Sequence, residues 1–209
     1  MTRLRWILFL LLCDLIPCQA GMVQSPPADS VAARFHRSLE LEQNGQINEA
    51  IHALNDVATS DYLVVLRLGW LHYQNKDYDR SREFYEDALR LSQNRSVEAL
   101  LGVTLPLAAE DKWDEVERAY QRILALDPKQ YDANLRLGQI QLNRGDYAAA
   151  ERHLVTVQRA YPGHYEPNLS LGWTLYQLGR TDEARTCFMR ALMLSPDDAS
   201  AREGLKLVP

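Results

Sequence analysis

The chain has 209 residues, of which 46% are hydrophobic and 24% are charged, and its formal net charge at pH 7 is -5. This composition is typical of a folded protein with one compact domain or one short repeat array, and it excludes extensive disorder. The negative charge argues against nucleic acid as a partner, because phosphate groups are neutralised by basic surfaces.

The first twenty residues differ from the rest of the chain. Arg3 and Arg5 precede a wholly apolar run over residues 6–12, and Cys18-Gln19-Ala20 places small residues before a cleavage point. A basic start, a short apolar stretch and a small-residue end are typical of a secretory signal peptide. We therefore expect residues 1–20 to be removed after Ala20 and the chain to be exported across the inner membrane, into a bacterial periplasm. No uncharged apolar stretch is long enough to predict a transmembrane span.

Two alternatives stay open for this N-terminal segment. One is a buried helix, which Asp14 and Pro17 would interrupt. The other is lipid attachment at Cys18, although proline directly before the cysteine fits a lipidation sequence poorly. Cleavage after Ala20 would leave Cys187 as the remaining cysteine, so we expect no internal disulfide and a buried thiol in an apolar helix.

Residues 21–30 contain Pro26-Pro27 with Ser and Gln nearby, a composition typical of a flexible linker. Helical periodicity follows the linker. Within it, prolines recur at a spacing of 34 residues, at Pro128, Pro162 and Pro196. A fixed period of this length predicts stacked copies of one small helical unit.

Each unit carries one small residue that is followed four residues later by a large one. The small residues are Ala50, Ser81, Val116, Ala150 and Ala184, and the large ones are Leu54, Tyr85, Tyr120, Leu154 and Phe188. This spacing places both on one helical face, and the small residue lets a paired helix approach. Gly69, Gly138 and Gly172 recur in the preceding helices, where they indicate close backbone packing rather than a helix end.

These positions resemble the tetratricopeptide repeat. The last full unit carries the motif most completely, with Leu171, Gly172, Gly179, Ala184, Phe188, Ala191 and Pro196. The resemblance implies an all-α fold, a right-handed α-solenoid of about five helix-turn-helix units over 31–198, divided into 31–61, 62–95, 96–130, 131–164 and 165–198. It also implies a capping helix and tail over 199–209, because the last unit would otherwise expose its apolar edge.

Two units depart from the pattern. The first has Arg37-Ser38 where Leu-Gly belongs, so we expect a degraded N-terminal unit. The third carries about two extra residues, and Pro106 falls inside its first helix. Proline removes a helical hydrogen bond and clashes with the carbonyl four residues earlier, here at Gly102. This predicts a kink or an early helix end near Leu105.

The resemblance also implies a concave groove lined by the first helix of each unit. The residues expected to face it and to bind a partner are Arg67, Trp70, Tyr73, Gln74, Arg136, Gln139, Asn143, Trp173, Tyr176 and Gln177. Aromatic and arginine side chains often dominate binding energy at protein interfaces. Two alternatives stay open: the aromatic rings pack between neighbouring first helices, and the arginines are ordinary solvated charges.

Some cochaperones of this family hold a peptide C-terminus with Lys and Asn at fixed groove positions. Here the corresponding residues are Leu66, Trp70, Ser96 and Leu100, so the resemblance does not extend to that clamp. We expect the ligand to be an extended segment or a helix, held by aromatic and polar contacts.

Catalytic chemistry has no counterpart in the sequence. The five histidines share no metal-like spacing, and the chain has no phosphate-binding glycine loop, no nucleophile elbow and no catalytic Cys/His pairing. We therefore expect no cofactor, no metal and no enzymatic activity.

Taken as a whole, the sequence predicts an exported scaffold that binds partner proteins or peptides through its concave groove. Its expected context is the assembly of an envelope, secretion or cytochrome-maturation complex. Two alternatives remain: an outer-membrane lipoprotein of the pilotin kind anchored through Cys18, and a non-catalytic subunit of an enzyme complex. Self-association through exposed repeat ends is compatible with the exported scaffold.

Overall fold

The computed structural model describes residues 30–55, 57 and 60–208, and all regular secondary structure in this part of the chain is α-helical. The predicted signal peptide, Cys18 and nearly all of the predicted linker lie outside the described residues. The helices are α1 (Val31–Gln43), α2 (Ile47–Asn55), α3 (Tyr62–Gln74), α4 (Tyr78–Leu91), α5 (Val97–Ala109), α6 (Trp113–Leu126), α7 (Tyr131–Arg144), α8 (Tyr147–Ala160), α9 (Tyr165–Gln177), α10 (Thr181–Leu194) and α11 (Ala199–Leu207).

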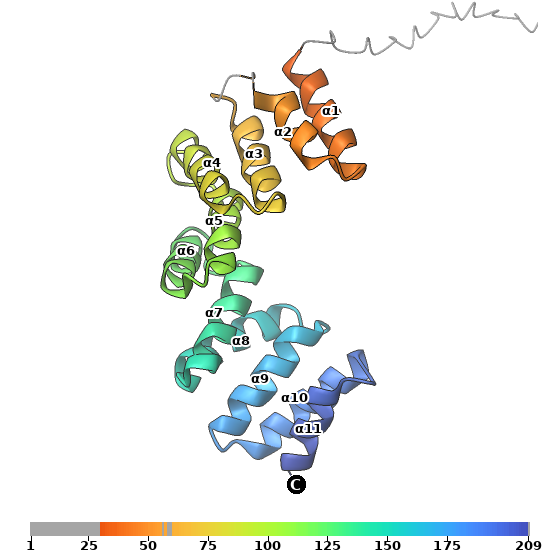
Figure 1. Ribbon diagram of the computed structural model, residues 1–209. Helices are drawn as coiled ribbons and strands as arrows, with labels where there is room; N and C mark the ends of the chain where they lie inside the picture. The colour runs from red at the N-terminus through yellow and green to blue at the C-terminus, as the bar shows by residue number, and fades with distance from the viewer. Residues whose placement is uncertain (1–29, 56, 58–59, 209) are drawn as a thin grey trace, which may run out of the picture.

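The helices pair into hairpins, and each hairpin packs on the next one along the chain. Contacts join α1 to α2, α3 to α4, α5 to α6, α7 to α8 and α9 to α10, and further contacts join each pair to its neighbour. Figure 1 shows the result as a curved stack of helix pairs that runs from one end of the molecule to the other, with α11 lying against the last pair. The all-α solenoid predicted from the sequence is confirmed.

Local sequence determines where the helices begin and turn. Ser30, Asp61, Ser96 and Asp198 each precede a helix and accept a hydrogen bond from a backbone N–H of its first turn, which satisfies a donor that has no partner within the helix. The turn inside each hairpin holds one residue with positive φ. These residues are Gly45 (75°), Lys76 (61°), Asp111 (57°), Gly145 (82°) and Gly179 (75°). Glycine adopts this conformation at little cost, whereas a side chain adds about 1 kcal/mol of strain.

The core is built where a large side chain of one helix lies over a glycine of another. A Cβ atom added to Gly102 on α5 would lie 2.2 Å from Cε1 of Tyr85 on α4, and one added to Gly138 would lie 2.5 Å from Cγ of Leu154. The predicted close packing at the recurring glycines is therefore present. Phe188 is enclosed in this way from two sides, by Gly172 on α9 and by Gly204 on α11.

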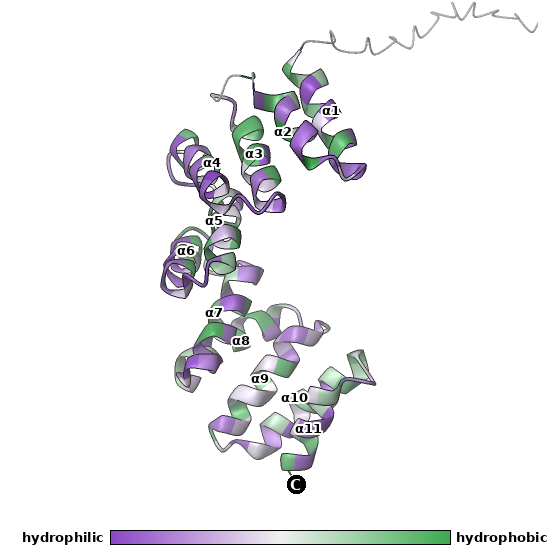
Figure 2. Cartoon of the chain, viewed as in Figure 1, coloured by the Kyte–Doolittle hydropathy of each residue, from purple (hydrophilic) through white to green (hydrophobic). Residues whose placement is uncertain are grey.

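Hydropathy follows this packing. Figure 2 shows hydrophobic residues concentrated on α3 and α5, while α4 presents mostly hydrophilic ones. Buried residues of α4, α5 and α6 join one continuous core cluster, which extends to Val65 of α3 and to Ala133 and Leu137 of α7. None of the described helices combines the length and the apolar character that a bilayer crossing requires.

Pro106 does not end its helix, and the expected early end near Leu105 is wrong. α5 continues through Pro106 to Ala109. Pro106 has no backbone N–H, so the hydrogen bond to the Gly102 carbonyl is absent. Val103 and Leu107 on the same helix are buried in the core, and their burial holds the last turn in place. The alternative outcome, a kink, stays a prediction.

The first hairpin departs from the repeat pattern and is nevertheless packed. Ser38 stands where the glycine is expected; its exposed fraction is 0%, and its hydroxyl accepts a hydrogen bond from Nε of Arg67 on α3 at 2.8 Å. Leu41, Leu54, Val64 and other residues form a core cluster that ties this hairpin to α3.

The contact between Gly102 and Tyr85 generates a stability prediction. We expect Gly102→Ala to lower the free energy of unfolding by about 1–3 kcal/mol, because the added methyl group would overlap a buried ring. Gly163→Ala is the matched control, since nothing lies within 4 Å of the Cβ position there. Denaturant unfolding followed by circular dichroism measures both, and equal stability of the two variants would contradict the packing.

Candidate functional site

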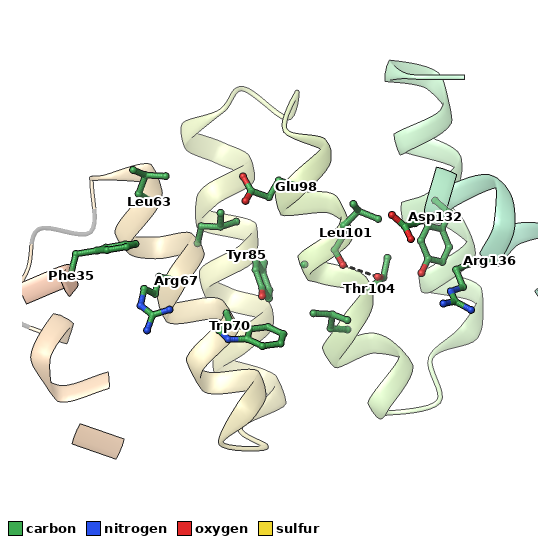
Figure 3. A pocket seen from close by; sticks show the side chains of 14 residues that line it. Phe35, Leu63, Arg67, Trp70, Tyr85, Glu98, Leu101, Thr104, Asp132 and Arg136 are labelled. Atoms are coloured by element: carbon green, nitrogen blue, oxygen red, sulfur yellow. Dashed lines mark hydrogen bonds between the residues drawn. The ribbon is translucent and has the colours of Figure 1, made fainter. Parts of the chain in front are cut away.

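A groove of about 610 Å³ runs along several helices of the described part of the chain and is here named the central groove. The first helices of three successive hairpins, α3, α5 and α7, supply most of its lining, with contributions from α1, α4 and α6 (Figure 3). The lining residues are Phe35, Leu63, Leu66, Arg67, Trp70, Tyr85, Glu98, Leu101, Gly102, Thr104, Leu105, Tyr120, Asp132 and Arg136.

The groove combines an apolar surface with charged residues of both signs. Leu66, Leu101 and Leu105 are partly exposed to it, and the buried rings of Tyr85 and Tyr120 lie behind them. In Figure 3 the carboxylates of Glu98 and Asp132 lie nearer the upper edge, whereas Arg67 and Trp70 lie nearer the lower edge. A bound chain would therefore meet apolar contacts along the groove and opposite charges on its two sides.

Three of the predicted partner-binding residues line the central groove: Arg67, Trp70 and Arg136. Trp70 is 36% exposed, and its ring lies 5.8 Å from that of Tyr73 between centroids. Gln74, one turn further along α3, is exposed. Arg67 and Trp70 lie at the N-terminal end of the groove, and Arg136 on α7 lies at its other end.

Arg67 is held by α1 more tightly than a solvated charge would be. Its exposed fraction is 9%, and its guanidinium lies 5.6 Å from the centroid of the Phe35 ring. Besides the bond from Nε to Ser38, Nη2 donates to the carboxylate of Glu42 at 2.8 Å. The alternative of an ordinary solvated charge is therefore wrong for Arg67.

Glu42 is the residue at this end of the groove that the sequence did not indicate. Its carboxylate accepts hydrogen bonds from Nε1 of Trp70 at 2.6 Å, Nη2 of Arg67 at 2.8 Å and Nε2 of Gln74 at 3.2 Å. Burial acts to raise the pKa of Glu42, but the hydrogen bonds from Trp70 and Arg67 outweigh it and hold that pKa below its ordinary value. Glu42 is therefore a carboxylate at neutral pH, bound by three side chains of α3.

Trp173 occupies the same repeat position as Trp70 but has a different environment. Its ring packs edge-on against Phe188 at 5.1 Å between centroids, and Nε1 donates to Oγ of Ser200 on α11 at 2.9 Å. The capping helix thus covers this tryptophan. Trp173, Tyr176 and the exposed Gln177 lie outside the central groove lining, so the two aromatic groups form no single site.

Of the partner-binding residues predicted on α7, one lines the central groove and the others do not. Arg136 lines the groove and donates to Oε1 of Gln139 at 2.8 Å, and its Nη1 lies 3.5 Å from Oε1 of Glu166. Gln139 in turn donates to Oγ of Ser170 at 3.2 Å. Asn143 is exposed outside the groove lining.

The third unit is shifted by two residues relative to the register that the clamp positions assume. Ser96 is the N-cap of α5 and Leu100 is fully buried, so neither faces the groove. The residues of this helix that line the groove are Glu98, Leu101, Gly102, Thr104 and Leu105. The reason is that α5 begins at Val97. The irregular spacing before the third unit made this start hard to locate from the sequence.

Two other side chains of types that often take part in catalysis, Cys187 and His153, have structural roles here. Cys187 is a buried free thiol whose pKa burial raises, so it remains protonated and unreactive. Burial lowers the pKa of His153, whose Nδ1 is hydrogen-bonded to Oδ1 of Asn134 at 3.0 Å. Within the described residues, no cluster of three His, Cys, Asp or Glu side chains could hold a metal ion.

Family models match most of the described chain. Two models, both described as tetratricopeptide repeat, match the sequence: one at residues 36–96 and the other at residues 107–163 and 144–206. Together they cover most of the helical hairpins, while residues 97–106, which hold the part of α5 that lines the groove, lie between the matched ranges.

Among curated proteins, the chain is similar to two peroxisomal targeting signal receptors. It is 31% identical over 139 residues to the receptor of Candida glabrata and 30% identical over 119 residues to that of Saccharomyces cerevisiae. The matches cover 62% and 56% of this chain but 23% and 19% of those receptors. The chain therefore spans less than a quarter of the length of either relative.

Solved structures share the architecture. YrrB, described as a tetratricopeptide repeat protein with an unusual peptide-binding site, matches with a TM-score of 0.67 at 16% identity, over 85% of this chain and 93% of that chain. MamA matches with a TM-score of 0.67 at 22% identity, over 80% and 93%. At these identities the likeness shows the fold.

The lowered pKa of Glu42 predicts an acid-dependent stability. The pKa of Glu42 in the folded protein lies below its unfolded value of about 4.3. The ionised carboxylate therefore stabilises the fold above that pH, and this stabilisation is lost as the pH falls through the folded pKa. We expect Glu42→Gln to lower the melting temperature at neutral pH, and the difference from wild type to shrink below about pH 4. Glu40→Gln is the control, since Glu40 is exposed on the same helix. A difference that stays constant with pH would contradict this prediction.

Proposed function

The chain belongs to the tetratricopeptide repeat family, and we propose that it is a binding scaffold that holds an extended segment of a partner protein in the central groove. The observation that carries this proposal is the continuous groove of about 610 Å³ along α3, α5 and α7. It is long enough to involve three successive hairpins, which favours an extended chain over a compact small molecule.

The lining indicates the chemistry of the segment. Leu66, Leu101 and Leu105 offer apolar contacts, and burying one large apolar side chain contributes about 1.5–3 kcal/mol. Glu98 and Asp132 on one side can accept hydrogen bonds from backbone N–H groups or from a basic side chain of the segment. The occupant we propose is therefore a segment of another protein with large apolar residues, with polar contacts that fix its direction.

The comparisons support a role in recognising segments. Two relatives are named as receptors for a targeting signal, and YrrB is described as having an unusual peptide-binding site. A catalytic role has less support, because Thr104, the one hydroxyl of serine or threonine type in the lining, donates to the Leu101 carbonyl of its own helix. We propose a non-catalytic role, either as an independent scaffold or as a subunit of an enzyme complex.

Export is part of the proposal and is supported by the sequence alone. The basic, apolar and small-residue segments over residues 1–20 are typical of a signal peptide. We propose a periplasmic location, in the assembly of an envelope, secretion or cytochrome-maturation complex. The alternative is a lipoprotein anchored through Cys18.

Binding to the groove is tested by selecting peptides from a displayed random library on the full chain. We expect Trp70→Ala and Leu101→Ala to weaken binding of a selected peptide by about tenfold or more, as central aromatic and apolar contacts do. Trp113→Ala is the matched control, because Trp113 is exposed on α6 outside the groove. Titration calorimetry measures the affinities and circular dichroism verifies helicity. Equal affinities of all three variants and wild type would place binding elsewhere.

The export proposal has a separate test. Mass spectrometry of the protein purified from the producing cell is expected to show an N-terminus at Gly21, because cleavage follows Ala20. An acylated Cys18 at the N-terminus would establish the lipoprotein alternative, and a chain that still begins at Met1 would exclude cleavage.

A further inference from the structure

The three donors around Glu42 come from one face of α3. Arg67, Trp70 and Gln74 are three and four residues apart, so they stand on successive turns and converge on one carboxylate. Charge-assisted hydrogen bonds of this kind are about twice as strong as neutral ones. The arrangement is that of a receptor for a carboxylate group.

The same donors border the place where a partner segment would lie. Arg67 and Trp70 line the N-terminal end of the central groove, and Gln74 continues their row into solvent. A carboxylate carried into this end of the groove would meet the three donors that Glu42 uses. No movement of the helices is needed to form the site.

The Arg67 guanidinium is held in place by buried contacts, whereas the more exposed Glu42 side chain can move away from it. The Arg67 side chain is 8% exposed and is fixed by Ser38 as well as by Glu42, while the Glu42 side chain is 20% exposed. Rotation about the side-chain bonds of Glu42 would bring its carboxylate to water, while Leu41 keeps α1 in the core. Donors that are already positioned bind a new group with a smaller loss of side-chain entropy.

We propose that Arg67, Trp70 and Gln74 form a carboxylate-binding site, which Glu42 fills in the free protein and an acidic side chain of the bound segment takes over. The identity of the incoming group rests on the proposed function; the binding site itself does not. Glu42 then acts as an internal competitor. Segments that carry an acidic residue beside their apolar ones displace it, and segments without one bind with Glu42 still in place.

The test uses acetate as the probe, so it needs no partner. In the Glu42→Ala variant of the full chain, we expect sodium acetate to shift the indole N–H resonance of Trp70 saturably and to raise the melting temperature. In the wild type, the apparent affinity for acetate should be lower by about tenfold or more, because an intramolecular carboxylate competes at a high effective concentration. Sodium chloride at equal ionic strength controls for screening, and Trp70→Phe assigns the resonance.

Two further variants make the outcome decisive. Glu40→Ala removes an exposed carboxylate of the same helix that pairs with Arg37, and it should behave as wild type. Gln74→Ala in the Glu42→Ala background removes one exposed donor and should weaken acetate binding. If Glu42→Ala does not fold, Glu42→Gln replaces it, since a neutral amide competes less than a carboxylate.

A Trp70 resonance that does not respond to acetate in the vacated site, or that responds equally in wild type, would overturn the proposal. Peptides with an amidated C-terminus that differ only in Glu or Gln then test the incoming group. Glu42→Ala should increase affinity for the Glu peptide more than for the Gln peptide, and an equal gain would exclude an acidic side chain as the occupant. If acetate binds but no peptide is selected on the groove, the proposed function fails and the carboxylate site stands.

Discussion

The close approach between a large side chain on one helix and a glycine on another determines how the hairpins stack. At Gly102 the ring of Tyr85 occupies the space that any Cβ atom would need, and Leu154 does the same at Gly138. Because protein interiors are closely packed, each such contact fixes the distance between two helices. Tyr85 lies against both Gly69 of α3 and Gly102 of α5 and so joins these two helices, and α7 completes the lining of the groove.

The groove owes both its apolar and its charged character to this stacking. Tyr85 and Tyr120 fill the space between hairpins, so the leucines of the first helices are left partly exposed above them. At the N-terminal end the regular pattern stops, and Ser38 and Glu42 of α1 meet Arg67 instead. The hairpin that departs most from the repeat thus supplies the polar contacts that distinguish this end of the groove.

The sequence predicts the parts that depend on period and size. The 34-residue spacing and the small and large positions indicate the hairpins, since they reflect local packing rules that recur in each unit. The sequence does not reveal Glu42, because its bonds to Arg67, Trp70 and Gln74 join residues of α1 and α3 that lie 25 to 32 positions apart in the chain. Of the kink or early helix end expected near Leu105, the early end was wrong, because the helix continues through Pro106 to Ala109 and Val103 and Leu107 of that helix are buried in the core.

Phe188 and Gly204 show how the stack could be extended. The aromatic ring lies over Gly204 of α11 in the way that the ring of Tyr85 lies over Gly102 of the following hairpin. In packing terms, α11 stands where the opening helix of one more unit would stand. A further helical hairpin from the same array could therefore be fused at this end. The lengthened solenoid would then have a contact between the old and new units that matches one already present in the protein.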